Sequence, residues 1–119
     1  MKSGNYVPDS GDIIWINFTP QAGHEQKDKR PAVVLSPKIY NEKTDLCIAV
    51  PITSKIKNYP FEVKLPDNLK TKGVVLADQI KSLDFVKREA KFIEKLPNNT
   101  LKEIKKLALL LINWFYAFT

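Results

Sequence analysis

The sequence predicts a mainly β protein, in which a small antiparallel β-barrel is followed by a single C-terminal helix. Short β-rich segments recur along most of the chain, separated by prolines, glycines or polar residues. The three-and-four spacing of apolar residues that is typical of an amphipathic helix is confined to the C-terminal end. A chain of 119 residues is about the size of one domain, so we expect residues 1–119 to form a single domain.

Residues 12–18 form the first predicted strand, because Ile14, Ile16 and Phe18 alternate with other residues and share one face. A glycine precedes this segment and a proline follows it within two residues, which marks both ends. The polar run 21–29 has no apolar period. It is expected to be a loop that is long enough to carry function.

The remaining predicted strands are β-rich segments with polar or proline-containing breaks between them: 31–35, 46–52, 61–65, 73–83 and 90–93. Their short spacing favours an antiparallel barrel. The C-terminal helix is predicted from apolar residues at intervals of three and four, and it should pack across one side of the barrel: Leu101, Ile104, Leu107, Ala108, Leu111 and Ile112.

Characteristic residues stand at both ends of this predicted helix. Asn99 or Thr100 can cap its first turn, and Glu103 stands three residues after Thr100, as in a capping box. The chain then ends in an aromatic run from Trp114 to Phe118. An apolar cluster of this kind is expected to be buried, partly at an interface with another chain.

The amino-acid composition indicates what kind of binding partner to expect. The formal charge is +6, from 19 Lys and Arg against 13 Asp and Glu, which favours a polyanionic or acidic partner over a neutral one. A lysine-rich solvated surface is the equally good alternative. The one cysteine, Cys47, lies in an apolar run and is expected to be a buried thiol in a reducing, cytoplasmic setting.

Several function classes have no support in the sequence. The lone His24 has no cysteine or histidine cluster around it, so no metal site is predicted. Neither a Walker loop nor a Rossmann fingerprint is present, so no nucleotide cofactor is expected. The N-terminus lacks the apolar region of a secretory signal, and no segment reaches the ~20 apolar residues of a membrane span.

Five segments, taken in order, resemble the MazF/PemK family of toxins: YVPD at 6–9, GDIIW at 11–15, RPAVVLSP at 30–37, YPFEV at 59–63 and LADQIKS at 76–82. The resemblance extends from about Tyr6 to the final helix, in the family's order and spacing. It implies an SH3-like β-barrel that works as a homodimer and is neutralised by an acidic MazE-like antitoxin. It also implies sequence-specific cleavage of single-stranded RNA without a metal, which leaves 2′,3′-cyclic phosphate and 5′-hydroxyl ends.

The resemblance assigns Arg30 and Thr53 as the catalytic pair. A planar guanidinium can bind two phosphoryl oxygens at once and stays charged, so Arg30 suits stabilisation of charge at phosphorus. The Thr53 hydroxyl can position phosphate or relay a proton, although its high intrinsic pKa makes it a poor base. From the residues alone, a surface salt bridge for Arg30 and a turn-capping hydroxyl for Thr53 are favoured.

The remaining predicted RNA-binding residues lie in loops or at strand ends. Glu25 and Gln26 match the family's first long loop. Recognition of unstacked bases needs aromatic faces and hydrogen-bonding groups, for which Phe18, Ser54 and Gln79 are candidates. Phe18 also continues the Ile14 and Ile16 face, so a place in the core is the alternative.

Lys29 can bind phosphate, as part of a basic rim: Lys27, Lys29, Lys55 and Lys57. His24 and Lys29 both depart from the family pattern, which leaves the general base and acid open. His24 is the only side chain with an unperturbed pKa near neutrality. Asp78 is interpreted as a structural carboxylate beside Gln79, and no role in the reaction is assigned to it.

Two other function classes stay open at this stage. A toxin that resembles the gyrase-poisoning CcdB type would bind a protein target through its C-terminal residues, and the aromatic end of the chain keeps this possibility alive. The chain lacks that family's terminal Trp-Gly-Ile, however. A non-toxic SH3-like domain that binds nucleic acid without cutting it is the third hypothesis.

Overall fold

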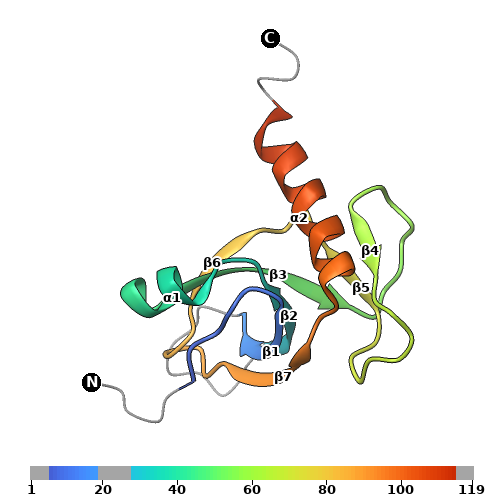
Figure 1. The fold of residues 1–119 in the computed structure, drawn as a ribbon. Coiled ribbons are helices and arrows are strands. Elements are labelled where there is room, and N and C mark those ends of the chain that lie inside the picture. The colour runs from blue at the N-terminus through green and yellow to red at the C-terminus, as the bar shows by residue number, and fades with distance from the viewer. Residues whose placement is uncertain (1–5, 19–27, 115–119) are drawn as a thin grey trace.

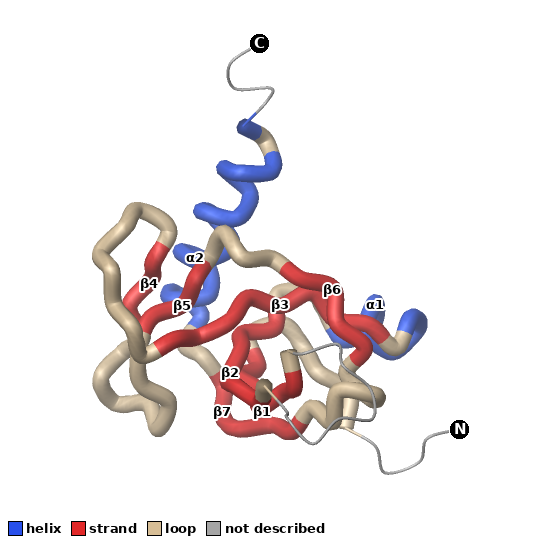
Figure 2. The backbone as a smooth tube through the Cα atoms, turned by 180° about the vertical axis from the view of Figure 1, so that it is seen from behind, coloured by secondary structure: helices blue, strands red, loops and turns tan. Residues whose placement is uncertain are grey.

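The computed structural model describes residues 6–18 and 28–114. Its elements, in chain order, are β1 (Asp12–Asn17), β2 (Lys29–Val34), α1 (Lys38–Thr44), β3 (Leu46–Thr53), β4 (Glu62–Lys64), β5 (Val74–Leu76), β6 (Lys81–Asp84), β7 (Lys91–Lys95) and α2 (Asn98–Ile112). The mainly β fold with a C-terminal helix is therefore confirmed. In both views, β4 and β5 lie at one end of the molecule, and α1 and β6 lie at the other (Figures 1 and 2).

All strand pairs in the described residues are antiparallel, in the order β4-β5-β3-β2-β1-β7, with β6 also on β3. No pairing between β4 and β7 closes this path in the part of the chain that the structure describes. The predicted barrel is thus an open, seven-stranded curved sheet. The central strands β1, β2 and β3 carry the two cores.

Alternation along the central strands sends successive side chains to opposite faces of the sheet. Ile13 and Val50 belong to one buried cluster, which the first turns of α2 cover with Leu101 and Ile104. Ile14 belongs to the other cluster. The sheet is therefore buried on both faces around β1 to β3, which gives the strand ends beside it a rigid support.

Two element predictions need correction. The segment 73–83 is two strands, because residues 77–80 form a turn in which Gln79 donates its N–H to the Leu76 carbonyl at 3.1 Å. Both strands pair with β3, through Ile52 with Val75 and Ile48 with Ser82. The helix α1 was not predicted.

The start and the end of α2 also differ from prediction. The N-cap residue is Pro97, which makes no side-chain cap, so Asn99 and Thr100 lie inside the helix and neither is the N-cap that was predicted. The Asn99 side chain still accepts the Thr100 N–H at 2.9 Å within the first turn. Its buried residues end at Ala108, and the turns after it project away from the sheet (Figure 1), with Ile112 64 % exposed. Within residues 6–18 and 28–114, no helix is long and apolar enough to cross a membrane.

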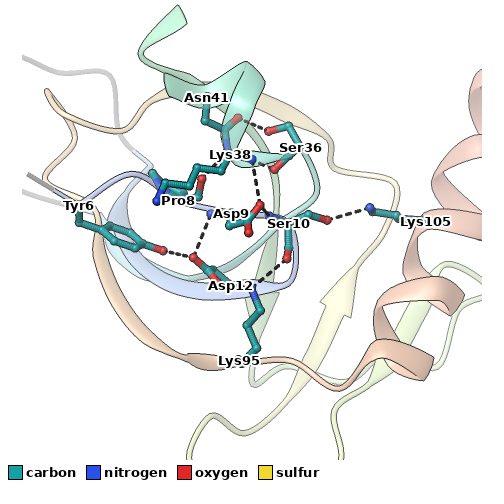
Figure 3. A network of polar contacts seen from close by, with 10 residues as sticks. All are labelled: Tyr6, Pro8, Asp9, Ser10, Asp12, Ser36, Lys38, Asn41, Lys95 and Lys105. Atoms are coloured by element: carbon teal, nitrogen blue, oxygen red, sulfur yellow. Dashed lines mark hydrogen bonds and ion pairs between the residues drawn. The ribbon is translucent and has the colours of Figure 1, made fainter. Parts of the chain in front are cut away.

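A buried carboxylate connects the N-terminal segment to β7 (Figure 3). Asp12 is only 5 % exposed, and it accepts hydrogen bonds from the Tyr6 hydroxyl and from Lys95 Nζ, the latter at 2.8 Å. In the same N-terminal segment, Ser10 Oγ accepts a hydrogen bond from Lys105 Nζ of α2 at 2.8 Å. A buried carboxylate is normally paired with an opposite charge, and Lys95 provides that charge for Asp12.

The same segment also holds α1 (Figure 3). Asp9 Oδ1 accepts the N–H of Lys38 at 2.9 Å, and the buried Asn41 amide donates to the Pro8 carbonyl at 2.8 Å. Ser36 Oγ donates to Asn41 Oδ1 at 2.6 Å. The N-terminal segment therefore fixes both helices relative to the sheet.

Glu94 on β7 anchors residues 70–71, and this contact predicts an acid-sensitive stability. Its carboxylate accepts the N–H of Lys70 at 3.1 Å and both the N–H and the hydroxyl of Thr71 at 2.7 Å. Partial burial works to raise the pKa of Glu94, but these hydrogen bonds outweigh it and lower the pKa below its ordinary value.

A lowered pKa means that the stabilisation is present above the ordinary glutamate pKa of about 4.3 and is lost as the pH falls through the folded-state pKa. We expect Glu94→Gln to lower the melting temperature at neutral pH and to match the wild type in strong acid. Thermal melts of both proteins across pH measure this. An equal difference at every pH would contradict the role of the carboxylate charge.

Candidate functional site

A pocket of about 430 Å³ lies where β2 begins and β3 ends. Among the residues that line it are four predicted site residues: Lys29, Arg30, Thr53 and Ser54. The strand register explains why they meet. Ala32 pairs with Pro51 across the antiparallel β2 and β3, so continuing that register brings Arg30 opposite Thr53.

Asp28 holds the Arg30 guanidinium at the edge of this pocket. Arg30 Nη2 lies 2.8 Å from Asp28 Oδ1 and 3.0 Å from Oδ2, and Nε lies 3.2 Å from Oδ1. The two side chains are 41 % and 43 % exposed, so the ion pair orients the guanidinium more than it stabilises the fold. A guanidinium carries five N–H donors, and one carboxylate cannot occupy all of them.

Phe18 supports Arg30 from the core side. Its ring centroid lies 5.8 Å from Arg30 Cζ, within the range of a cation–π contact. Phe18 is only 8 % exposed and packs among the buried residues around Ile14 and Ile16. This burial favours the core alternative for Phe18 over a base-stacking surface.

Thr53 occupies the opposite wall, in a tight turn. Its Oγ1 accepts the N–H of Lys55 at 3.1 Å, which is the turn-capping contact that hydroxyls often make. The hydroxyl proton is not used in this bond, so the side chain keeps a donor. Thr53 is partly exposed at the pocket.

Gly73 packs against Thr53 and was missed by sequence reasoning. Its φ of +120° is one that side chains rarely adopt, and a Cβ there would lie 2.3 Å from the Thr53 carbonyl oxygen. A glycine at the start of a predicted strand was the available signal, because such a glycine often marks a close backbone approach. The close approach of Gly73 to the end of β3 therefore depends on the absence of a side chain at this position.

Arg88 is a second residue that sequence reasoning missed. Its Nη1 donates to the carbonyls of Asn17 and Phe18 at 3.2 and 3.0 Å. Asp28 donates its N–H to Asn17 Oδ1 at 3.0 Å and accepts the Phe18 N–H at 2.9 Å. The two chain ends next to residues 19–27 are thus held together beside Arg30. Nothing in the sequence indicates that an arginine in a distant turn makes this contact.

The other predicted residues are placed as follows. Gln79 lies outside this pocket and lines a neighbouring one of about 270 Å³, which also contains Thr53. Lys29 forms an ion pair with Glu89 at 3.0 Å. The predicted loop residues lie outside the described residues: His24, Glu25, Gln26 and Lys27.

The charge and the chemistry of the pocket suit an anionic group. Four basic residues line it, against the single carboxylate of Asp28: Lys29, Arg30, Lys55 and Lys72.

Two other kinds of chemistry find no support in the residues that the structure describes. Burial raises the pKa of the Cys47 thiol to about 12, so this cysteine stays protonated and is a poor nucleophile. Among the described residues, no three His, Cys, Asp or Glu side chains are placed to hold a metal ion.

Comparison with known proteins agrees with the resemblance found in the sequence. Residues 9–112 match the family model described as PemK-like, MazF-like toxin of type II toxin-antitoxin system. The chain belongs to the PemK/MazF family. The endoribonuclease toxin MazF of Escherichia coli K12 is 54 % identical over 85 residues, which is 71 % of this chain and 76 % of the relative. The endoribonuclease PemK of Escherichia coli is 34 % identical over 98 residues, 79 % of this chain and 74 % of PemK.

Solved structures of PemK/MazF proteins share the fold. A crystal structure of MazF from Deinococcus radiodurans superposes with a TM-score of 0.84 at 50 % identity, and covers 92 % of this chain and 99 % of that one. A MazE–MazF crystal structure from the same organism gives a TM-score of 0.82 at 43 % identity, over 92 % and 98 % of the two chains. These relatives favour the ribonuclease hypothesis over the CcdB-like one.

Proposed function

We propose that this protein is a toxin that cleaves single-stranded RNA at short specific sequences, without a metal, with residues 1–119 acting as one domain. The observation that carries the proposal is the meeting of Arg30 and Thr53 in one basic pocket. Two relatives, at 54 % and 34 % identity, are named endoribonucleases, and this supports the proposal.

The proposed reaction is an internal transfer at phosphorus. The 2′-hydroxyl of the ribose loses its proton as its oxygen attacks the adjacent phosphorus, the bond from phosphorus to the 5′-oxygen breaks, and the leaving 5′-oxygen takes up a proton. The products are a 2′,3′-cyclic phosphate and a 5′-hydroxyl. Arg30 stabilises the negative charge that develops on the phosphoryl oxygens, and the Thr53 hydroxyl donates to one of them. Both side chains sit on strand ends of a buried sheet, so little reorganisation is needed during the reaction.

RNA binding in this proposal uses both pockets. Lys29 and the lysines of the 54–57 segment attract the backbone phosphates. Ser54 and Gln79 offer hydrogen bonds to the RNA, and Glu25 and Gln26 contribute from the loop. Phe18 enters the proposal as the support beneath Arg30.

We further propose that an acidic MazE-like antitoxin inhibits the protein by lying in the groove that RNA would use. The MazE–MazF structures from Deinococcus radiodurans are those of relatives at 43 % to 51 % identity. A basic groove suits an acidic segment as well as it suits RNA, so the two should compete. A cytoplasmic location is part of this proposal.

A homodimer is the last part of the proposal, supported by an apolar groove of about 460 Å³ between α1 and the projecting turns of α2. Leu35, Tyr40, Ile48 and Ile112 line it, and Leu109 on the same helix is 55 % exposed. An exposed apolar patch of this kind is typical of a protein–protein interface.

If a second copy covers this groove, Leu109→Asp should convert the dimer to a monomer, because the interface would have to bury an unpaired carboxylate. Sedimentation equilibrium at micromolar concentration measures the mass. Lys102→Asp, which places the same side chain on an exposed position outside the groove, is the matched control and should leave the dimer intact. A wild-type protein that is monomeric at this concentration would contradict the proposal.

The test of the proposed function is cleavage of a long unstructured RNA in EDTA, with analysis of the product ends. We expect cuts at a recurring short sequence, with cyclic phosphate on one side and a 5′-hydroxyl on the other. RNA that is bound but left intact would support the non-cleaving hypothesis. Activity only after addition of a divalent metal would contradict the metal-independent reaction.

A further inference from the structure

A short N-terminal segment, residues 8–12, is hydrogen-bonded to the sheet and to both helices (Figure 3), and we call it the N-terminal strap. Gly11 donates its N–H to the Val34 carbonyl, and its own carbonyl accepts the N–H of Leu96, both at 2.8 Å. The strap is therefore fixed between the end of β2 and the residue after β7. From this fixed position it contacts α1 on one side and α2 on the other.

The position of α1 depends on polar contacts with the strap more than on apolar packing. Among the seven residues of this helix only Asn41 is buried, while Ile39 is 68 % exposed. The Asn41 amide donates to the Pro8 carbonyl at 2.8 Å, and Asp9 Oδ1 accepts the N–H of Lys38 at 2.9 Å. A short helix with no buried apolar side chain needs such bonds to stay in one place. The strap supplies them.

Ser10 makes the contact with α2. Its hydroxyl oxygen accepts a hydrogen bond from Lys105 Nζ at 2.8 Å, and its carbonyl accepts one from Lys95 Nζ at 3.2 Å. Lys105 follows Ile104, which is fully buried in the core. The strap therefore adds a polar contact to α2 beside the apolar packing of its first turns.

The two helices that the strap contacts form the two walls of the apolar groove of about 460 Å³. Ser36, Pro37 and Tyr40 line the groove on the side of α1, and Lys105 and Leu109 line it on the side of α2. Two of these residues belong to the polar network as well, since Ser36 donates to the Asn41 side chain and Lys105 donates to the strap. The network and the groove therefore share residues on both walls.

We infer that the N-terminal strap sets the separation of the two walls, and that it thereby determines how tightly a second copy of this chain binds in the groove. A gap of about 0.5–1 Å between packed atoms already forfeits a quarter to a half of their dispersion attraction. Asp9 and Ser10 line no part of the groove, so they are positioning residues that act through α1 and α2. The inference rests on the proposed homodimer and names residues outside its interface that keep the interface in shape.

The experiment measures the dimer dissociation constant of the wild type, Asp9→Ala and Ser10→Ala by sedimentation velocity over a dilution series. Asp9→Ala removes the acceptor of the Lys38 N–H, and Lys38 is exposed, so water can replace the carboxylate and the fold should survive. The second copy must then restore the order that the strap supplied, and the dissociation constant should rise about tenfold. Ser10→Ala releases Lys105 and should raise it about threefold.

Asp84→Ala is the matched control. Asp84 is a partly exposed carboxylate on β6 that accepts the backbone N–H groups of Val86 and Lys87, much as Asp9 accepts two backbone N–H groups in the strap region. It does not line the groove. Asp84→Ala should therefore lose a comparable set of hydrogen bonds and still dimerise like the wild type.

Amide hydrogen exchange separates a positioning role from a general loss of stability. In Asp9→Ala, the amides of α1 should exchange faster while those of the central strand β3 stay protected. Dimers as tight as the wild type in both strap variants would overturn the inference, whether or not α1 exchanges faster. A weaker dimer with equally faster exchange throughout β3 would also overturn it, because the whole fold would then have lost stability. A wild type that is monomeric at micromolar concentration would instead overturn the proposed homodimer, and the role of the strap with it.

Discussion

Arg30→Ala is expected to lower kcat for RNA cleavage by about 100- to 1,000-fold, the usual cost of removing one donor from a developing oxyanion. The guanidinium sits opposite Thr53 in the pocket and is held there by Asp28 and by the ring of Phe18. Alanine removes both the charge and the two-pronged geometry. Single-turnover cleavage of a short RNA that contains the preferred sequence measures the effect.

Arg30→Lys separates charge from geometry. Lysine restores a positive charge but not two parallel donors, so its activity should lie between those of the wild type and Arg30→Ala. Asp28→Asn tests whether orientation by the carboxylate matters, and it should lower the rate less than the loss of the guanidinium. All three variants should melt close to the wild type, because an ion pair this exposed contributes little to stability. Full activity of Arg30→Ala would remove Arg30 from the mechanism.

The strands of the central sheet could be predicted because both of their faces are apolar, whereas the pairing that forms the site could not. Nothing in the local pattern around Arg30 or Thr53 indicates that β2 and β3 bring them together, since antiparallel register is set by the whole sheet. Their assignment came from family resemblance. From the residues alone, the alternatives describe real contacts too: Arg30 does form a salt bridge, and Thr53 does cap a turn.

The missed elements lack the patterns on which prediction depends. In α1, Ile39 is 68 % exposed and the polar Asn41 is the buried residue, so no apolar face is visible in the sequence. The turn between β5 and β6 contains neither glycine nor proline, so the run appeared continuous. A buried polar residue such as Asn41 needs hydrogen-bond partners, and its partner Pro8 is distant in sequence.

The close approach of two backbones also accounts for the second large effect, which is expected for Gly73→Ala. The φ of +120° alone costs a residue with a side chain about 1–3 kcal/mol. In addition, the new Cβ would lie 2.3 Å from the Thr53 carbonyl oxygen and 3.0 Å from its carbon, which are backbone atoms that cannot rotate away. The pairing of Thr53 with Val74 must therefore open. We expect a large loss of cleavage together with a lower melting temperature.

Gly11→Ala is the matched control for this variant. Gly11 also has a left-handed φ, +91°, but its Cβ would meet side-chain atoms rather than backbone: Leu101 Cδ2 at 3.2 Å and Lys95 Cε at 3.7 Å. Its backbone is hydrogen-bonded to Val34 and Leu96, and it lines neither pocket around Thr53. Gly11→Ala should therefore share part of the stability loss and keep its cleavage rate below the melting transition. If Gly73→Ala also cleaved RNA at the wild-type rate while folded, the position of the Thr53 backbone could not be important for the reaction. A selective loss in Gly73→Ala would show that the site depends on how closely two strand ends approach, as well as on the side chains that line it.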